Sequence, residues 1–304
     1  MGYLFSLLGA LLFGANGSVT KVVIEAGLSP LQLTQFRVLG CCIIAGAVLL
    51  VVDRRAFFLT RRQLLVMAVL GVFGVAILQA SYAAAIQLLP VGIALLFEYT
   101  AVLFVALIAF LFLHEKVKAR LWVAIVAVLV GLAVVAQVWA SSLNGLGILL
   151  ALLASASLTT YFLVGERQVG ATSPLAVAFW TMLFASVFWA FFSGWWEVTP
   201  AVLTAPTMVG PLWLPLLANI VFGTFLSFYF SFLALKHLSA TAAGITASSE
   251  VIFAFAVAFL WLGEGLTPVQ LIGAAVVLVG IILAQTARAN KVVDADLALA
   301  PSLD

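Results

Sequence analysis

Long apolar segments recur along the chain, and short polar or proline-containing breaks separate them. They lie at residues 3–22, 31–52, 64–85, 91–113, 120–138, 145–165, 174–195, 212–235, 239–262 and 267–287. Each segment has about 20 residues, the length that an α-helix needs to cross the hydrocarbon core of a bilayer. The segments are continuously apolar rather than alternating, which indicates helices and not the strands of a membrane barrel. The pattern predicts an all-α integral membrane protein with ten transmembrane helices.

The composition narrows the range of functions. Of 304 residues, 66% are hydrophobic and 8% are charged, whereas a soluble domain is about a quarter charged. This excludes a soluble enzyme, a nucleic-acid-binding protein and a disordered scaffold, and it makes the lipid bilayer the expected environment. The connections between segments are too short for an extramembrane domain, so any activity resides among the helices. Residues 288–304 are polar and are expected to form a tail.

The basic residues fall mainly on one side of the predicted membrane. The chain has 13 lysines and arginines, of which Lys21 lies at the opposite edge and Arg37 inside the second span. Because basic connections remain in the cytoplasm, both termini are expected there, with the protein in a bacterial inner membrane. The other eleven basic residues lie on the side of the termini: Arg54, Arg55, Arg61, Arg62, Lys116, Lys118, Arg120, Arg167, Lys236, Arg288 and Lys291.

The chain contains an internal repeat. Residues 93–136 align with 242–285 without a gap, and twelve of the 44 positions are identical. The repeat unit holds five spans, at residues 1–141 and 142–287, and an odd number places the second unit in the membrane with inverted topology. In secondary transporters two such units enclose a central cavity and move around it. The alternative is a duplication within a membrane enzyme or a scaffold.

Several short motifs of the chain occur together. They are Phe13-Gly14, Lys21, Gly27-x-Ser29-Pro30, Arg37, Gly92-Ile93-Ala94-x3-Glu98-Tyr99-Thr100, Ser249-Glu250, Phe259-Leu260-x-Leu262-Gly263-Glu264 and Thr267-Pro268-x-Gln270-Leu271. With these motifs the sequence is similar to the EamA branch of the drug/metabolite transporter superfamily, and its residues 92–100 are similar to bacterial threonine/homoserine exporters. The resemblance implies ten helices in an inverted repeat, a central cavity, and export of small metabolites or amino acids. Relatives often carry proline just after the glutamate, whereas Tyr99 and Val251 follow here, so a helix kink at these positions stays open.

Ionisable residues within the spans are the first candidates for function, because charge inside hydrocarbon is costly. Glu98 lies in the fourth span and Glu250 in the ninth. In the repeat alignment, Glu250 falls opposite a position three residues from Glu98, which is about one helical turn away. A buried carboxylate could bind a proton or a substrate ammonium group. The alternative is a fixed ion pair, such as Glu98 with Arg37 or Lys21.

Arg37 and Lys21 also have two interpretations. Either side chain could receive the carboxylate of an amino-acid substrate. Each could instead pair with Glu25 near the outer surface or extend its long side chain to the interface.

The remaining candidates are polar and aromatic residues within the spans. Each could line the cavity or make a hydrogen bond between helices. Glu115 and Glu264, at the ends of the fourth and ninth spans, are expected to cap helices or close a gate. The cavity candidates are Asn16, Gln79, Tyr82, Tyr99, Tyr161, Trp180, Tyr229 and Ser249.

No sequence motif indicates catalysis, a cofactor or a metal. The expected protein is a secondary transporter that exports amino acids or related amphiphilic metabolites by alternating access, with small molecules and protons as its partners. One alternative is a facilitator or exchanger that is independent of protons. Another is a structural membrane subunit without transport activity, and no oligomeric state is predicted.

Overall fold

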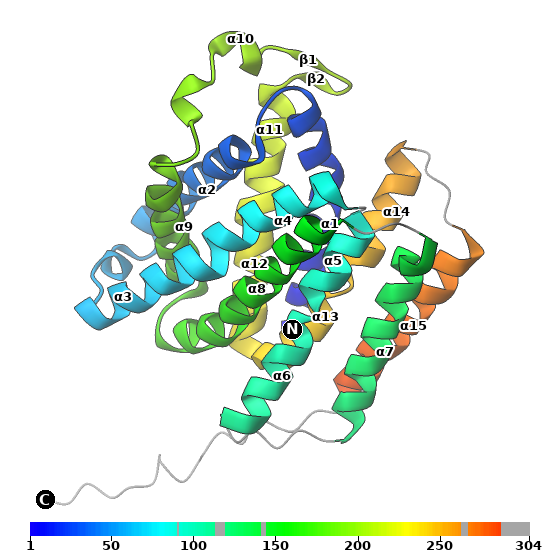
Figure 1. Ribbon diagram of the computed structural model, residues 1–304. Helices are drawn as coiled ribbons and strands as arrows, with labels where there is room; N and C mark the ends of the chain where they lie inside the picture. Colours follow the sequence, from blue (N-terminus) through cyan, green and yellow to red (C-terminus); the bar gives the residue numbers. More distant parts are fainter. Residues whose placement is uncertain (90, 113–118, 141–143, 263–266, 287–304) are drawn as a thin grey trace, which may run out of the picture.

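The computed structural model describes residues 1–89, 91–112, 119–140, 144–262 and 267–286, in which ten helical spans pack side by side (Figure 1). Seven of these spans are long and apolar enough to cross a membrane, and three are shorter apolar helices. The predicted all-α membrane fold with ten spans is therefore confirmed. The unbroken spans are α1 (Gly2–Glu25), α2 (Pro30–Val52), α7 (Ala119–Ala136), α8 (Gly145–Ala171), α9 (Pro174–Ala190) and α15 (Pro268–Thr286).

Four spans are divided, and they form two pairs of repeat equivalents. The third and eighth spans each contain a π-helical segment, and the fourth and ninth are each interrupted near the middle. The third span comprises α3 (Arg61–Val69), η2 (Leu70–Ala76) and α4 (Ile77–Leu88), and the eighth comprises α11 (Trp213–Ile220), η5 (Val221–Leu226) and α12 (Ser227–His237). The fourth comprises α5 (Val91–Tyr99) and α6 (Ala101–Phe112), and the ninth comprises α13 (Ala240–Ala247) and α14 (Glu250–Leu262).

Short elements lie in the connections between spans. The connection after α9 was expected to begin after residue 195, but α9 ends at Ala190. Gly194, with a φ of 65°, turns the chain there, a conformation that glycine adopts without steric cost. The short elements are η1 (Arg54–Phe57), η3 (Val138–Ala140), η4 (Trp195–Glu197), α10 (Pro200–Leu203) and the antiparallel strands β1 (Pro206–Thr207) and β2 (Gly210–Pro211).

The second helix of each half begins with the same serine–proline pair. Ser29 caps α2 by accepting a hydrogen bond from the backbone N–H of Gln32, and Pro30 occupies the first turn. Ser173 and Pro174 begin α9 in the same way. A serine cap satisfies an N–H that the helix leaves free, and proline has no N–H to lose.

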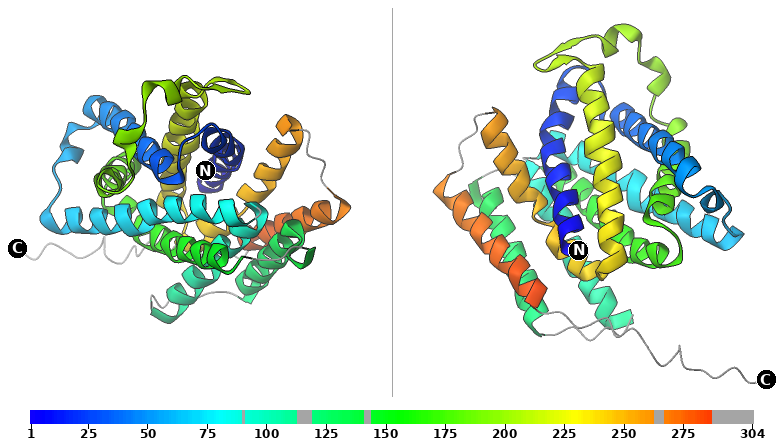
Figure 2. Two further views of the ribbon diagram at one scale, coloured as in Figure 1. Left: turned by 45° about the horizontal axis from the view of Figure 1, so that its top comes forward. Right: turned by 180° about the vertical axis from the view of Figure 1, so that it is seen from behind.

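The packing of the helices follows the repeat. The helix α1 packs against α12, α13 and α14, and its equivalent α8 packs against α4, α5 and α6. The helices α2 and α9 pack against each other, as do α7 and α15, which lie side by side at one edge (Figure 2). Exchanging the two halves therefore reproduces these contacts, as expected for an inverted repeat, but α8 also packs against α12 and α13 without a contact of comparable extent between α1 and α4 or α5 among the described residues.

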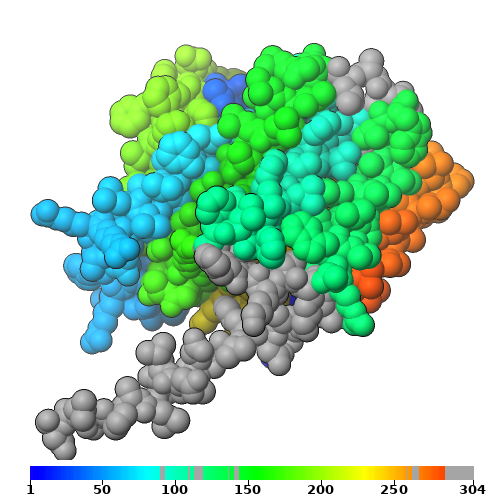
Figure 3. All heavy atoms as spheres, turned by 60° about the horizontal axis from the view of Figure 1, so that its bottom comes forward, coloured from blue at the N-terminus to red at the C-terminus, as the bar shows by residue number. Residues whose placement is uncertain are grey.

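Two packing groups follow from these contacts, and each joins elements of both halves. The α1 group comprises α1, α11 to α12, α13 and α14, and the α8 group comprises α8, α3 to α4, α5 and α6. In Figure 3, α3 at one edge and α15 at the other are joined by packed atoms of α6, α7 and α8. The first helix of each half thus packs mainly against spans of the other half.

Two glycines bring α7 and α15 into close contact. A Cβ atom on Gly131 would lie 2.8 Å from the backbone nitrogen of Val277. One on Gly273 would lie 2.6 Å from the backbone nitrogen of Val135. Small residues of this kind allow membrane helices to approach closely.

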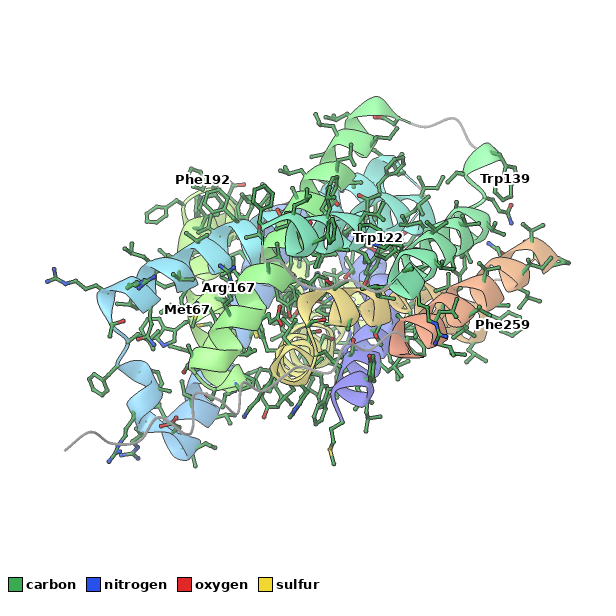
Figure 4. The ribbon with its side chains drawn as sticks, turned by 90° about the horizontal axis from the view of Figure 1, so that it is seen from below. Met67, Trp122, Trp139, Arg167, Phe192 and Phe259 are labelled. Carbon is green, nitrogen blue, oxygen red and sulfur yellow. The ribbon has the colours of Figure 1, made fainter. Side chains whose placement is uncertain are left out.

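The outer surface of the bundle carries large apolar side chains. Trp139, Phe192 and Phe259 point outward (Figure 4) and are 64%, 63% and 50% exposed. A soluble monomer rarely exposes so many large apolar groups. This surface fits contact with lipid.

Candidate functional site

A cavity lies between the α1 group and the α8 group. It contains about 750 Å³ of space not occupied by atoms, including the part that is continuous with the outside. Its walls combine apolar side chains with amides, tyrosines and three ionisable groups. The lining residues are Ala10, Phe13, Asn16, Gly17, Thr20, Arg37, Leu78, Gln79, Tyr82, Glu98, Tyr99, Leu158, Tyr161, Phe162, Phe228, Ser231, Ala247 and Glu250.

Helix breaks in the fourth and ninth spans position both carboxylates of the cavity. The first break lies at Thr100, whose hydroxyl donates to the Phe97 carbonyl at 2.6 Å. The second lies at Ser248 and Ser249, whose hydroxyls donate to carbonyl oxygens three residues earlier at 2.6 and 2.8 Å. Such bonds compete with the regular helical ladder. The breaks are thus present without the proline that relatives often carry.

Glu250 is the first residue of α14 and is bonded across the cavity. The Tyr99 hydroxyl lies 2.7 Å from Glu250 Oε2 and 2.9 Å from the Ala247 carbonyl oxygen, so its single proton can be donated to either acceptor. Tyr99 belongs to α5 and Glu250 to α14, so this contact links the α8 group to the α1 group.

Glu98 lies near the end of α5 and is 7% exposed. Among the described residues, its Oε2 atom has no hydrogen-bond partner. The nearby charge that acts on it is that of Glu250, which has the same sign. The carboxyl group is therefore available to an occupant of the cavity.

Arg37 enters the cavity from α2 and is 6% exposed. Its Nε atom donates to the Thr224 hydroxyl at 2.9 Å, and Nη2 lies 3.5 Å from the Gly223 carbonyl. Both partners lie in the π-helical segment η5. These bonds fix the guanidinium on the α1 group, so the alternative of an Arg37–Glu98 pair is not what holds this side chain.

Amide groups and a tyrosine add neutral hydrogen-bonding capacity. Gln79 is 6% exposed, and neither its Nε2 nor its Oε1 atom has a partner among the described residues. The Asn16 Nδ2 atom contacts the Thr20 hydroxyl at 3.5 Å, whereas its Oδ1 is without a described partner. Tyr82 lines the cavity one turn of α4 beyond Gln79. Buried polar atoms are normally hydrogen-bonded, so these groups suit a polar occupant.

Aromatic side chains form one end of the cavity. Tyr161 on α8 packs on Phe228 and Phe232 of α12, with ring centroids 5.7 and 5.1 Å apart. Phe232 is fully buried and lies toward the end of α12 from which α13 begins. Beyond it, the Glu166 carboxylate accepts a bond from the Ala240 N–H at 3.0 Å. The α1 and α8 groups therefore meet and close the bundle at this end.

Eight of the twelve predicted site residues line the cavity, and four lie elsewhere. Lys21 is exposed, and Trp180 donates from Nε1 to the Ala56 carbonyl at 3.0 Å. The Tyr229 ring stacks on Phe225, and the Ser249 hydroxyl takes part in the helix break. Glu115 and Glu264 lie outside the described residues. The eight that line the cavity are Asn16, Arg37, Gln79, Tyr82, Glu98, Tyr99, Tyr161 and Glu250.

Sequence reasoning omitted some lining residues from the predicted site. Ser231 follows Ser227 at helical spacing, but nothing in the sequence orients that face. The apolar lining residues, such as Phe13 and Leu158, carry no signal that separates cavity from core. In the described part of the chain, no group of three histidine, cysteine, aspartate or glutamate side chains could hold a metal ion.

A family model described as the EamA-like transporter family matches residues 1–137 and again residues 145–286. The chain belongs to the EamA-like transporter family. This EamA-like chain is thus a membrane transporter of the drug/metabolite transporter superfamily. One solved structure, described as "Crystal structure of protein", is similar with a TM-score of 0.75 and 18% identity, over 94% of this chain and 96% of its own. At that identity the likeness concerns the fold. No curated protein matches the chain.

Proposed function

We propose that this transporter exports amino acids or closely related small metabolites by alternating access, driven by the proton gradient. The observation that carries the proposal is the cavity between the two packing groups, which holds two carboxyl groups, one guanidinium and amides with free polar atoms. Ionisable side chains within the hydrocarbon core are rare in membrane proteins, and where they occur they usually mark a functional site.

The polar groups of the cavity fit a zwitterion. A substrate ammonium group finds an acceptor in the unpartnered oxygen of Glu98. A substrate carboxylate finds donors in the Gln79 amide and in the Arg37 guanidinium, which has N–H groups beyond those bonded to η5. The apolar walls of Phe13, Leu78 and Leu158 accommodate an aliphatic or amphiphilic side chain.

Proton coupling follows if a proton and the substrate ammonium group compete for one carboxylate. Substrate then binds from one side when the carboxylate is free, and a proton replaces it from the other side. The two sides alternate when the α1 and α8 groups change their relative tilt, as in other inverted-repeat transporters. The similarity of residues 92–100 to threonine/homoserine exporters supports amino acids as the substrate class and export as the direction.

The proposed orientation places both termini in the cytoplasm of a bacterial cell, with the protein in the inner membrane. The distribution of basic residues supports it. In this orientation the aromatic end of the cavity, where α13 begins, faces the cytoplasm. The structure then corresponds to a state that is closed toward the cytoplasm.

The first test is transport by purified protein in proteoliposomes preloaded with an equimolar mixture of the twenty protein amino acids. Efflux is measured by mass spectrometry with and without an imposed pH gradient, for the native protein and for Glu98→Gln. We expect gradient-driven efflux of a subset of amino acids, and we expect Glu98→Gln to abolish the response to the gradient. Asp53→Asn, which removes an exposed carboxylate in the connection after α2, is the control and should leave efflux unchanged.

Each other outcome selects a different function. Efflux that ignores both the gradient and the substitution contradicts proton coupling and leaves a facilitator or exchanger. Absence of efflux for every amino acid, from vesicles that contain folded protein, contradicts amino acids as substrates. The same result with a wider metabolite mixture favours the structural subunit.

A further inference from the structure

The two carboxyl groups of the cavity occupy different positions relative to the helix breaks. Glu98 lies at the end of the half-helix α5, and Glu250 is the first residue of the half-helix α14. In the repeat alignment Glu98 matches Ala247, and Glu250 matches Ala101. The repeat therefore does not make the two acids equivalent.

The half-helices surround these acids with opposite fields. The N-terminus of a helix carries partial positive charge and stabilises an anion, whereas the C-terminus carries partial negative charge. Glu250 is in the first turn of the 13-residue helix α14. Glu98 is in the last turn of the nine-residue helix α5. The backbone favours negative charge on Glu250 and opposes it on Glu98.

The side-chain partners differ in the same direction. The Tyr99 hydroxyl lies 2.7 Å from Glu250 Oε2, to which it can donate, and Arg37 supplies a positive charge that acts on Glu250. Glu98 has an oxygen without a partner among the described residues, and the charge that acts on it is that of Glu250. Glu250 thus has a hydrogen-bonding partner and feels a nearby cation, whereas in the described part of the chain Glu98 Oε2 has no hydrogen-bond partner.

The charges of the cavity-lining residues also distinguish Glu98 from Glu250. Of the lining residues, Arg37, Glu98 and Glu250 carry formal charge, so one cation faces two acids. Burying an uncompensated charge is expensive. Since Arg37 is bonded to η5 and acts on Glu250, the charge left to balance is that of Glu98. Among the described residues, the titratable groups that interact with Glu98 are Glu250 on α14, Tyr82 on α4 and Tyr99 on α5, none of which supplies a cation.

We propose that Glu98 is the exchangeable cation site of the cavity, and that Glu250 is the acid that keeps its negative charge more readily, positioned by Tyr99 and within the field of Arg37. The assignment rests on the proposed function, because the cation that Glu98 exchanges is the coupled proton or the substrate ammonium group. Tyr99 is a positioning residue that acts through Glu250. Replacement of one acid should therefore have a different effect from replacement of the other.

Infrared spectroscopy of the full-length protein in lipid bilayers tests this without any transported substrate. The probe is the proton itself, supplied as a pH series from mildly acid to alkaline. A protonated carboxyl group shows a C=O stretching band that a carboxylate lacks. Subtracting the spectrum of Glu98→Gln or Glu250→Gln from that of the native protein isolates the bands of the missing group.

The native-minus-Glu98→Gln spectrum should contain a carboxyl C=O band that is lost as the pH rises. The native-minus-Glu250→Gln spectrum should retain carboxylate bands to a lower pH than the native-minus-Glu98→Gln spectrum does. Glu98→Asp should retain a titrating band at a shifted frequency. Tyr99→Phe should shift the carboxylate bands of Glu250 and leave the Glu98 band in place. If Tyr99 had only a general structural role, its replacement would not change the Glu250 bands selectively.

A titrating band that disappears in Glu250→Gln and persists in Glu98→Gln would overturn the assignment, as would bands that titrate together in both variants. These spectra do not depend on transport. Expected spectra with silent proteoliposomes would refute the proposed function and leave the assignment standing. Reversed spectra would refute the assignment even if amino acids are transported.

Discussion

At the scale of single residues, depth in the membrane could be predicted from the sequence, but the direction of a side chain could not. Glu98, Glu250 and Arg37 stand out because ionisable groups within apolar spans are rare, and all three line the cavity. Trp180 and Tyr229 also lie within spans, but they make other contacts. The spans are apolar on every side, so their sequences do not indicate which face of each helix points toward the cavity.

Gln79 provides a prediction at this scale. Both of its polar side-chain atoms are buried without a described partner, so Gln79→Leu removes an unsatisfied group rather than a bond. We expect the melting temperature to stay the same or rise, because replacing unpaired buried polar atoms by apolar ones is neutral or stabilising. We also expect the KM for amino-acid efflux to increase several-fold.

The control for Gln79→Leu is Gln35→Leu. Gln35 is also buried and lies outside the cavity, and although its Oε1 has no described partner, its Nε2 donates to the Ser186 hydroxyl at 3.3 Å. Its loss should lower stability by about 1 kcal/mol and leave the KM unchanged. Thermal unfolding in detergent and efflux from proteoliposomes measure the two effects. A destabilised Gln79→Leu protein with normal KM would show that Gln79 is a structural residue.

At the scale of elements, the apolar pattern predicts where spans begin and end but not where they are interrupted. The breaks at Thr100 and at Ser248 and Ser249 arise from hydroxyl groups that bond to nearby carbonyls, and such residues also occur in regular helices. The π-helical segments η2 and η5 lie at equivalent positions of the two halves, where π-helical turns often mark functional sites. Their apolar sequences carry no comparable signal.

The contact between Arg37 and η5 leads to a prediction for Thr224. Its hydroxyl accepts from Arg37 and donates to the Asn219 carbonyl at 3.0 Å, so Thr224→Val releases the guanidinium from η5. The sequence Val-Phe-Gly precedes Thr224 in η5 and Val75 in η2, which indicates that a π-helical segment tolerates valine at this position. We expect the rate of efflux to fall several-fold because Arg37 is no longer held in place.

Thr181→Val is the matched control for Thr224→Val. Thr181 is also fully buried, but its hydroxyl bonds to carbonyls of its own helix α9. Efflux by Thr181→Val should remain near the native rate. Equal losses in the two variants would indicate that buried threonine hydroxyls, and not the position of Arg37, determine the rate.

At the scale of the whole molecule, the repeat predicts two inverted halves around a cavity, but the structure groups the helices differently. The helix α1 packs mainly against spans of the second half, and α8 mainly against spans of the first. Aligned sequences reveal equivalence and not contact, so this exchange of the first helices could not be read from the repeat. It determines which surfaces must separate during alternating access.

Cross-linking tests which surfaces separate. A Cβ atom on Gly165 of α8 would lie 3.1 Å from a side-chain carbon of Leu235 on α12, so Gly165→Cys with Leu235→Cys joins the two groups at the aromatic end. We expect oxidation of this pair to stop efflux and a reducing agent to restore it. The background for the experiment replaces Cys41 and Cys42 by alanine, because both are free thiols.

The control pair, Ser6→Cys with Ala243→Cys, lies within the α1 group. The Ser6 hydroxyl donates to the Ala243 carbonyl at 3.3 Å, so α1 and α13 are in contact there. Oxidation of this pair should leave most of the efflux intact, because the two helices move together. If this pair blocked efflux and the α8–α12 pair did not, the moving units would be the two sequence halves, since Ser6 and Ala243 lie in different halves whereas Gly165 and Leu235 share one.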